Sequence, residues 1–305
     1  MFAWTILLSL GAIWGASYMF IKVGGAEIPP FTFVEGRTLI AAGALYAAMR
    51  LRAEKFPRDL KTWRALIAMG IFNGVIPYTL ITWGETHISS GLAAILTAAM
   101  PVFSVIIAHF ATRDERITLP KTLGILVGFI GVSVLFLPEL RRGLQIEFWG
   151  EFGIVVSAAS YALATIIARK NLMGMSHVVA STGQLASTAA MMLPFSLLFN
   201  NPFALQPSPA AIFSLLTLAL LGTAIAYILY YWLIENTGAT RTSLVTYLIP
   251  ITGVIWGALL LNEKIEIEAI VAMVLIIAGV ALVNRQAAPA IRPVIASRGA
   301  AKQSP

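Results

Sequence analysis

Residues 78–106 read YTLITWGETHISSGLAAILTAAMPVFSVI, two apolar runs joined by a short polar turn. A matching pattern follows 149 residues later, where residues 227–255 read YILYYWLIENTGATRTSLVTYLIPITGVI. The pairs of identical residues are Tyr78 and Tyr227, Leu80 and Leu229, Trp83 and Trp232, Thr97 and Thr246, Pro101 and Pro250, Val105 and Val254, and Ile106 and Ile255. Because these identities keep their order along the chain, we interpret the two stretches as equivalent parts of two repeated units.

The repeat extends outward from this stretch in both directions. Near the front, GASY at 15–18 matches AASY at 158–161, and further on DERI at 114–117 matches NEKI at 262–265. The expected divisions are a first unit over residues 1–140, a second over 149–285, and a disordered cytoplasmic tail over 286–305.

The composition excludes a soluble protein. Apolar residues make up 58% of the 305-residue chain and charged residues 11%, against about 45–50% and about 25% in soluble domains. So few charges cannot coat a globule of this length, and the apolar excess must therefore face lipid. A membrane-spanning helix needs about 20 mainly apolar residues. Ten apolar runs are found, at 4–21, 31–49, 65–84, 88–110, 122–138, 150–168, 178–199, 210–234, 240–261 and 267–284.

The positive charges are sorted between alternate connections. Of the 21 Lys and Arg residues, 16 fall in every second connecting segment or in the C-terminal tail. By the positive-inside rule, these segments and both termini are cytoplasmic. The sequence thus predicts a multi-pass inner-membrane protein that contacts lipid. The formal net charge of +7 then reflects this sorting, and we expect no nucleic-acid partner.

Each unit holds five runs, an odd number, so the second unit must enter the membrane inverted relative to the first. The predicted fold class is an all-α integral membrane protein with ten transmembrane helices, arranged as two inverted five-helix repeats around a central cavity. Inverted repeats are a recurring construction of secondary transporters, in which substrate binds near the membrane midplane between the halves.

Aromatic and polar side chains recur at helical spacing inside several runs. Taken singly, such residues more often pack between helices or face lipid. Their recurrence in both units favours the interpretation that they line a cavity and bind substrate. These residues are Trp14, Ser17, Tyr18, Tyr78, Thr82, Ser157, Ser160, Tyr161, Gln184, Tyr227, Tyr231 and Tyr247.

Each unit also carries a Thr-x-x-x-Pro motif deep inside an apolar run, Thr97 with Pro101 and Thr246 with Pro250. Proline cannot donate a hydrogen bond to the carbonyl four residues earlier. The motif therefore predicts a kink, a freed carbonyl and a hydroxyl in one place, which a polar cavity tolerates better than lipid. The alternative is a kink that shapes the helix without contacting a ligand.

Charged residues lie near the ends of the runs. For Arg37, the deepest of them, we weigh anchoring at headgroup level against a role at an external gate, and Glu35 and Glu85 are further candidates for gating or coupling. The absence of mid-run cations argues against phosphate esters as substrates. The chain has no cysteine, and no base stands beside a nucleophile in the runs. We therefore expect no enzyme, no cofactor and no metal.

Several of these residues form a pattern that resembles the drug/metabolite transporter superfamily, in its ten-helix members built from two EamA-type units. The pattern consists of WGASY at 14–18 followed by Lys22, then Arg37, Pro101 and Pro250, with Glu115 and Glu263 just past the fourth and ninth runs. The resemblance covers residues 1 to about 285 and implies a basket of ten helices around a central cavity.

Within that superfamily the chain is most similar to aromatic amino-acid exporters of the YddG type. The small four-helix multidrug relatives carry a membrane Glu where this chain has Trp14, eight residues before Lys22. This departure puts proton-coupled export of lipophilic cations through that carboxylate in doubt.

These observations favour a monomeric transporter of small neutral or zwitterionic solutes, with aromatic and other apolar amino acids as the expected substrates. Rings would stack on the apolar part of the solute and face its ammonium group. Two alternatives stay open, a multidrug exporter of hydrophobic cations and a membrane receptor that does not transport.

Overall fold

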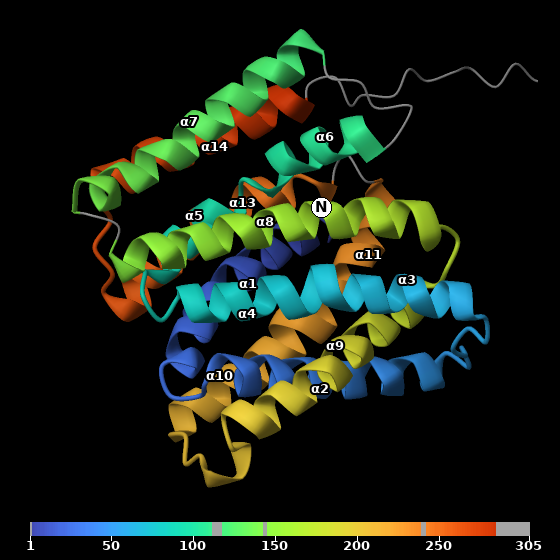
Figure 1. Cartoon of the computed structure of the whole chain (residues 1–305). Coiled ribbons are helices and arrows are strands. Elements are labelled where there is room, and N and C mark those ends of the chain that lie inside the picture. Colours follow the sequence, from blue (N-terminus) through green and yellow to red (C-terminus); the bar gives the residue numbers. More distant parts are fainter. Residues whose placement is uncertain (1, 112–117, 143–144, 239–241, 285–305) are drawn as a thin grey trace, which may run out of the picture.

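The computed structural model describes residues 2–111, 118–142, 145–238 and 242–284, and these residues form helices and no β-strand (Figure 1). Both the predicted tail at 286–305 and Glu115 lie outside the described residues. In the first unit the helices are α1 (Phe2–Gly25), α2 (Pro30–Leu51), α3 (Leu60–Gly70), η1 (Ile71–Val75), α4 (Ile76–Gly84), α5 (Ser90–Thr97), α6 (Met100–Ala111) and α7 (Leu119–Arg142). In the second they are α8 (Ile146–Asn171), α9 (His177–Phe199), η2 (Pro202–Ala204), α10 (Pro209–Ala219), η3 (Leu220–Ile225), α11 (Ala226–Thr237), α13 (Val245–Leu261) and α14 (Ile267–Asn284).

Among the described residues, six helical segments are long and apolar enough to cross a membrane, by length and composition, which makes this a multi-pass chain. They are Phe2–Gly25, Leu60–Gly84, Ser90–Ala111, Leu119–Pro138, Ile146–Asn171 and Pro209–Thr237. α13 and α14 are shorter apolar helices. α2 is 22 residues long but contains Glu35, Arg37 and Arg50, which lower its apolar character. Ten crossings therefore remain a prediction.

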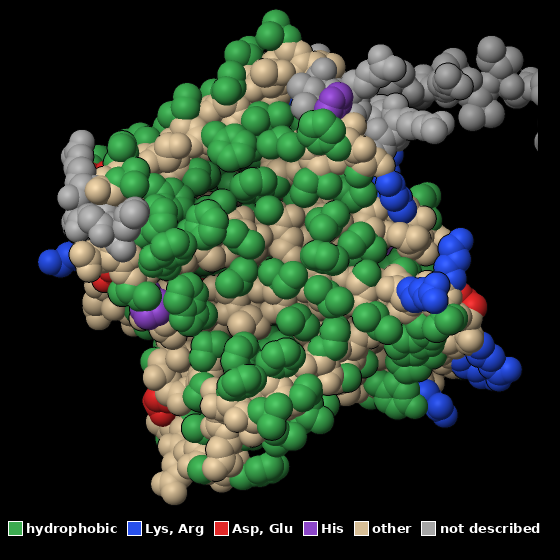
Figure 2. Space-filling view, viewed as in Figure 1, with side chains coloured by type: hydrophobic (Ala, Val, Ile, Leu, Met, Phe, Trp, Pro, Cys, Tyr) green, Lys and Arg blue, Asp and Glu red, His purple; other side chains and the backbone are tan. Residues whose placement is uncertain are grey.

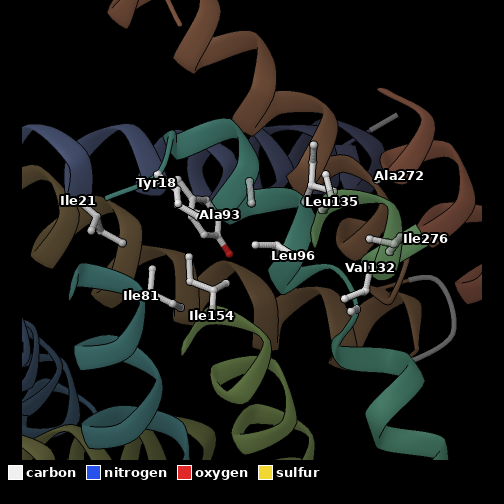
Figure 3. Packing of buried hydrophobic residues seen from close by; sticks show 14 of the residues in the cluster. Tyr18, Ile21, Ile81, Ala93, Leu96, Val132, Leu135, Ile154, Ala272 and Ile276 are labelled. Atoms are coloured by element: carbon white, nitrogen blue, oxygen red, sulfur yellow. The ribbon is translucent and has the colours of Figure 1, made fainter. Parts of the chain in front are cut away.

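Outward-facing side chains along the helices are largely apolar, as a lipid environment requires. Figure 2 shows hydrophobic side chains spread over the middle of one face and Lys and Arg side chains gathered at one end. The segment from the end of α2 to the start of α3 is rich in cations, with Arg50, Arg52, Lys55, Arg58, Lys61 and Arg64, and the last turn of α8 adds Arg169 and Lys170. Within the molecule, Tyr18 lies in an apolar cluster beside Ala93, Leu96 and Ile154 (Figure 3).

α7 and α14 run side by side at the edge of the molecule (Figure 1). Small residues allow this contact: a Cβ atom on Gly124 would lie only 2.6 Å from the carbonyl oxygen of Gly279. The same close approach of backbones is common between membrane helices. The remaining helices pack across the two units, with α2 against α9, α1 against α13, and α4 against α8.

Two π-helical turns interrupt helices at equivalent positions. η1 joins α3 to α4 and η3 joins α10 to α11, and Ile71 and Leu220, where they begin, are 149 residues apart, the spacing of the sequence repeat. Each segment contains a glycine in close contact with another helix, Gly74 with Thr188 of α9 and Gly222 with Ser17 of α1. Single π-turns within α-helices are often found at functional sites.

The two prolines expected to kink their helices behave differently. Pro101 lies in the first turn of α6, just after a break between α5 and α6 at residues 98–99. At that position the missing N–H of proline has no helical partner to lose. Pro250 instead lies inside α13, which continues through it from Val245 to Leu261. The break beside Pro101 is a distortion of the predicted kind in the first unit, whereas the kink at Pro250 stays a prediction, because an unbroken helix can bend at a proline.

Candidate functional site

Two tyrosines at equivalent repeat positions meet between the units. The hydroxyl oxygens of Tyr78 in α4 and Tyr227 in α11 lie 3.1 Å apart in a hydrogen bond. Asn73 of η1 and Gln184 of α9 each donate a side-chain N–H to the Tyr227 hydroxyl at 3.3 Å. A hydroxyl has two acceptor lone pairs and one proton, so Tyr227 donates its own proton to Tyr78. The ring of Tyr161 in α8 approaches Tyr78 edge-on, with centroids 6.4 Å apart. We call these three tyrosines the tyrosine cluster.

Arg37 of α2 reaches into this region. Its side chain is buried, with 7% exposed. The guanidinium carbon lies 3.9 Å from the centroid of the Tyr78 ring, and Nε donates a hydrogen bond of 3.0 Å to Oγ1 of Thr223 in η3. The expectation of an interior without fixed cations is thus wrong. The sequence identifies Arg37 as the deepest charge in the runs, but position along a helix does not show that the long side chain extends inward to Tyr78 and Thr223.

A cavity of about 400 Å³ opens at one end of the molecule. Its walls come mainly from the end of α2, the start of α9 and from α11, and they include Tyr227, Tyr231, Ser181 and Leu45. Tyr227 therefore belongs both to this cavity and to the tyrosine cluster. We call the end that bears residues 52–59 and 172–176 the pocket end. It is also the end that bears the cations of the segment between α2 and α3, of which Arg52 lines the cavity.

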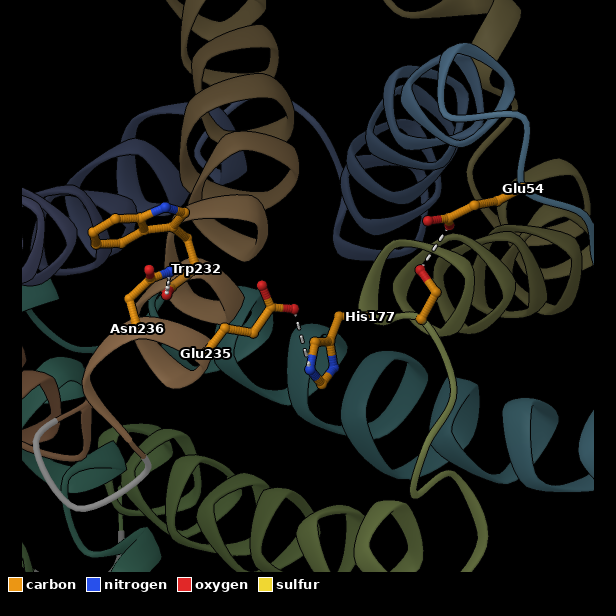
Figure 4. Close-up of polar contacts among 6 residues, drawn as sticks. Glu54, His177, Trp232, Glu235 and Asn236 are labelled. Carbon is orange, nitrogen blue, oxygen red and sulfur yellow. Dashed lines mark hydrogen bonds and ion pairs between the residues drawn. The ribbon is translucent and has the colours of Figure 1, made fainter.

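Polar side chains surround the mouth of the pocket (Figure 4). The imidazole of His177 stacks on the Tyr231 ring at a centroid distance of 4.2 Å, and its Nε2 lies 3.9 Å from a carboxylate oxygen of Glu235. Opposite them, Ser176 donates a hydrogen bond of 2.6 Å to Glu54. The mouth thus combines aromatic faces with two carboxylates and the guanidinium of Arg52.

At the opposite end, which bears residues 85–89 and 262–266, hydrogen bonds join distant elements, and we call it the closed end. The carboxylate of Glu263 accepts hydrogen bonds from Ser90 N at 2.8 Å, Ser90 Oγ at 3.0 Å and Gly91 N at 3.1 Å. These are the first residues of α5, so Glu263 caps a helix from across the molecule. Lys22 Nζ donates to the carbonyl oxygens of Glu85 and Ile88, at 2.6 and 2.8 Å. Glu85 itself is 1% exposed.

The other predicted site residues are dispersed. Several hydroxyls bond to backbone carbonyls, at distances between 2.6 and 3.0 Å: Ser17 to Ile13, Thr97 to Ala93, Ser157 to Ile154, Ser160 to Phe72 and Thr246 to Ser243. Thr82 is buried without a hydrogen-bond partner. The ring of Trp14 packs against Tyr230, and Tyr247 lies partly buried beside the core cluster of Tyr18. Glu35 is half-buried in α2. Of the predicted set, the structure brings together Tyr78, Tyr161, Tyr227 and Gln184, with Tyr231 in the adjoining pocket.

Sequence reasoning missed the mouth residues His177, Glu54 and Glu235 and the π-helical turns. In the sequence the three histidines, His87, His109 and His177, are too scattered to indicate a metal site, and their residue type gives no other signal. A usable signal was position, since His177 begins one run and Glu235 ends the next, which places both at the same membrane surface. The turns could have been suspected from Asn73-Gly74 and Gly222-Thr223, poor helix formers inside apolar runs.

Comparison with known proteins agrees with this architecture. The EamA-like transporter family matches the chain twice, over residues 1–137 and 148–285. The chain is 27% identical to the uncharacterized transporter YoaV of Bacillus subtilis (strain 168), over 90% of this chain and 94% of that protein. It is 25% identical to the uncharacterized inner membrane transporter YedA of Escherichia coli (strain K12), over 95% and 94% respectively.

A solved structure, described only as the crystal structure of a protein, is similar in fold, with a TM-score of 0.66 and 19% sequence identity. The match covers 92% of this chain and 96% of that chain. The family and the names of its relatives point to transport and not to catalysis. With two matches that together span nearly all of the described helices, this multi-pass membrane protein belongs to the EamA-like transporter family.

Proposed function

We propose that this membrane transporter exports, facilitates or exchanges small neutral or zwitterionic metabolites, in particular aromatic and other apolar amino acids, by alternating access. The observation that carries this proposal is the pocket of about 400 Å³ whose inner wall includes Tyr227, hydrogen-bonded to Tyr78. A volume of this size lies within the range of about 300–1,000 Å³ that small-molecule sites occupy. Because Tyr227 lines the pocket and contacts the buried Tyr78, the tyrosine pair would form the inner limit of the pocket in this state.

The chemistry of the pocket suits an amino acid with an apolar side chain. Tyr227, Tyr231 and His177 offer ring faces for stacking. Glu54 and Glu235 at the mouth offer carboxylates to a substrate ammonium group. The uncharged side-chain amides of Asn73 and Gln184, next to the Tyr227 hydroxyl, offer further hydrogen bonds to a polar substrate group.

The arrangement of the two ends supports alternating access. The pocket end is hollow, and the closed end is tied by Glu263 and Lys22. We propose that the chain crosses the membrane ten times as two inverted repeats, that it acts as a monomer, and that the pocket end and both termini face the cytoplasm. The equivalent π-turns and the Tyr78–Tyr227 pair support the repeat, and the cations at the pocket end support the orientation.

Counterflow in proteoliposomes tests the proposal. Liposomes loaded with unlabelled L-phenylalanine should take up radiolabelled L-phenylalanine, and a Tyr227→Ala variant should lose nearly all of this flux because it removes the pocket wall. Tyr46→Ala, an exposed tyrosine of α2 that lies outside the pocket lining, is the matched control and should keep wild-type flux. Absence of flux in the wild type, across a panel of amino acids, would refute amino-acid transport.

A second candidate function rests on the two carboxylates at the mouth. Glu54 and Glu235 would also attract a hydrophobic cation, as a multidrug exporter requires. Tetraphenylphosphonium flux abolished by Glu235→Gln, without flux of phenylalanine, would favour this function. Specific binding of either solute without flux of any solute would indicate a receptor.

A further inference from the structure

Arg37 is a buried cation with most of its hydrogen-bonding capacity unused. A guanidinium has five N–H donors in a planar fork. In the structure only Nε has a partner, Thr223 Oγ1 at 3.0 Å. Among the described residues the two terminal nitrogens have no hydrogen-bond acceptor, and Arg37 forms no ion pair. A buried charge in this condition costs several kcal/mol of desolvation unless a counter-ion or water reaches it.

The orientation of this guanidinium is fixed by its neighbours. The Thr223 hydroxyl donates its proton to the carbonyl oxygen of Leu218 at 2.9 Å, so its lone pairs are turned toward Arg37 Nε. The ring of Tyr78 covers one face of the guanidinium at 3.9 Å. Thr223 lies in η3, which is the repeat counterpart of η1, and Tyr78 is the repeat counterpart of Tyr227. Both contacts of Arg37 are therefore made to positions that the two units share. The edge that remains free carries the two terminal nitrogens, the edge that binds a carboxylate through two parallel hydrogen bonds.

Arg37 also lies on the route that a solute would take. Leu45, eight residues later in α2, lines the pocket, so Arg37 is about 12 Å nearer the closed end at 1.5 Å per residue. Tyr78 connects the two places, since its hydroxyl bonds to the pocket residue Tyr227 and its ring contacts Arg37. Solute that passes the Tyr78–Tyr227 pair therefore meets the guanidinium next.

We propose that Arg37 is a substrate subsite that binds the carboxylate group of the transported molecule after it passes the tyrosine pair. This inference deepens the proposed function, because it restricts the substrates to small carboxylates, whether they are amino acids or simple organic acids. Amines, amides and uncharged sugars lack the group that Arg37 binds.

The test compares molecules that differ only in the carboxylate. Inhibition of L-phenylalanine counterflow is measured with 3-phenylpropionate, which keeps the carboxylate, and with 3-phenylpropanamide, which replaces it with an amide. Wild-type protein should be inhibited by the acid at a concentration about tenfold or more below that of the amide, the loss expected for one charge-assisted contact. Arg37→Gln should lose this preference, and Arg37→Lys should keep part of it.

Arg50→Gln, at the exposed far end of the same helix, is the matched control and should keep the full preference. An Arg37→Gln protein with wild-type discrimination between acid and amide would overturn the proposal.

If wild-type protein transports no amino acid, the proposed function fails, and Arg37 is then tested by binding alone. In that arm 3-phenylpropionate should raise the Tm of wild-type protein and of Arg50→Gln, raise it less in Arg37→Lys, and leave it unchanged in Arg37→Gln. Equal shifts in all four proteins, or none in any, would also overturn it.

Discussion

The two ends of this molecule use their carboxylates in different ways. At the closed end, Glu263 accepts three hydrogen bonds from the first residues of α5 and so joins distant parts of the chain. At the pocket end, Glu235 is 64% exposed and lies 3.9 Å from a histidine that is itself 39% exposed. The first arrangement fixes helices relative to one another, and the second leaves charged groups free to meet solvent or solute. Opening the closed end therefore costs the free energy of the Glu263 hydrogen bonds, whereas the pocket end is open without breaking such contacts.

The largest effect on the difference between the two ends is expected when the hydrogen bonds of Glu263 are removed. Glu263→Ala leaves the N–H groups of Ser90 and Gly91 without their acceptor, and hydrogen bonds to a charged group contribute about 1.5–3 kcal/mol each. We expect the closed end to lose about 2–4 kcal/mol of stability, because water replaces part of the contact. Since the chain has no cysteine, a single Ile88→Cys substitution can report opening through its rate of reaction with a water-soluble thiol reagent.

The control for that measurement is Glu235→Cys, at a pocket-lining position whose side chain is 64% exposed. Its reaction rate should be high with Glu263 present and should fall or stay unchanged in the Glu263→Ala background. An Ile88→Cys rate that does not increase in Glu263→Ala would show that this carboxylate does not hold the closed end.

A smaller effect is expected from Glu85, just after α4. Burial raises the pKa of its carboxyl group well above the ordinary value of 4.5. Lys22 and Arg37 act in the opposite direction, and Glu263 adds to the rise. A closed end that raises this pKa binds the proton more tightly than an open, wet end, so closure is favoured at low pH. Closure weakens as pH increases from about 4.5 toward the raised value.

Glu85→Gln should therefore remove most of the pH dependence of Ile88→Cys labelling over that range, while keeping the shape of the side chain. His87 lies nearby in the same connecting segment, and His87→Gln serves as the comparison that should leave the pH dependence in place. A pH profile that is unaltered in Glu85→Gln would assign the titration to another group.

At the pocket end the corresponding change should be modest. His177→Ala removes the stacking contact with Tyr231 and the weak pairing with Glu235, both partly exposed. Exposed pairs of this kind contribute about 0–1 kcal/mol. We expect a shift in Tm of only a few degrees and an altered solute affinity measured by counterflow. A loss of stability as large as that of Glu263→Ala would contradict the distinction between the two ends.

The smallest effect is expected at Glu27, on the surface of the closed end. Hydrogen bonds from the Ser208 hydroxyl and N–H, both 2.6 Å long, lower the pKa of this exposed carboxyl group. A lowered pKa in the folded state means that the contact stabilises above the unfolded pKa and is lost as pH falls through the folded one. Glu27→Gln should make the thermal midpoint slightly less dependent on pH below about 4.5, as differential scanning fluorimetry can measure.

The two central tyrosines of the candidate site could be predicted from the sequence, because helical periodicity is a local property of the chain. The 149-residue repeat placed Tyr78 and Tyr227 at equivalent positions, and the structure brings their hydroxyls into contact. Periodicity could not distinguish these residues from Trp14, which packs on Tyr230 in a separate apolar cluster. Whether an aromatic ring faces a cavity or a neighbouring helix depends on what lies opposite it, and that partner is distant in the sequence.

The sequence by itself determined that this chain is an integral membrane protein and that its two halves are similar. The free energy of transferring side chains from water to an apolar environment is roughly additive over residues. A chain with 58% apolar and 11% charged residues therefore favours lipid over water, whatever its fold. Only the tertiary structure decided that Arg37 is buried against Tyr78 and Thr223, that Glu263 caps α5, and that one end is hollow. These features depend on directional contacts between residues far apart in the chain, where a shift of one helix against another changes every partner.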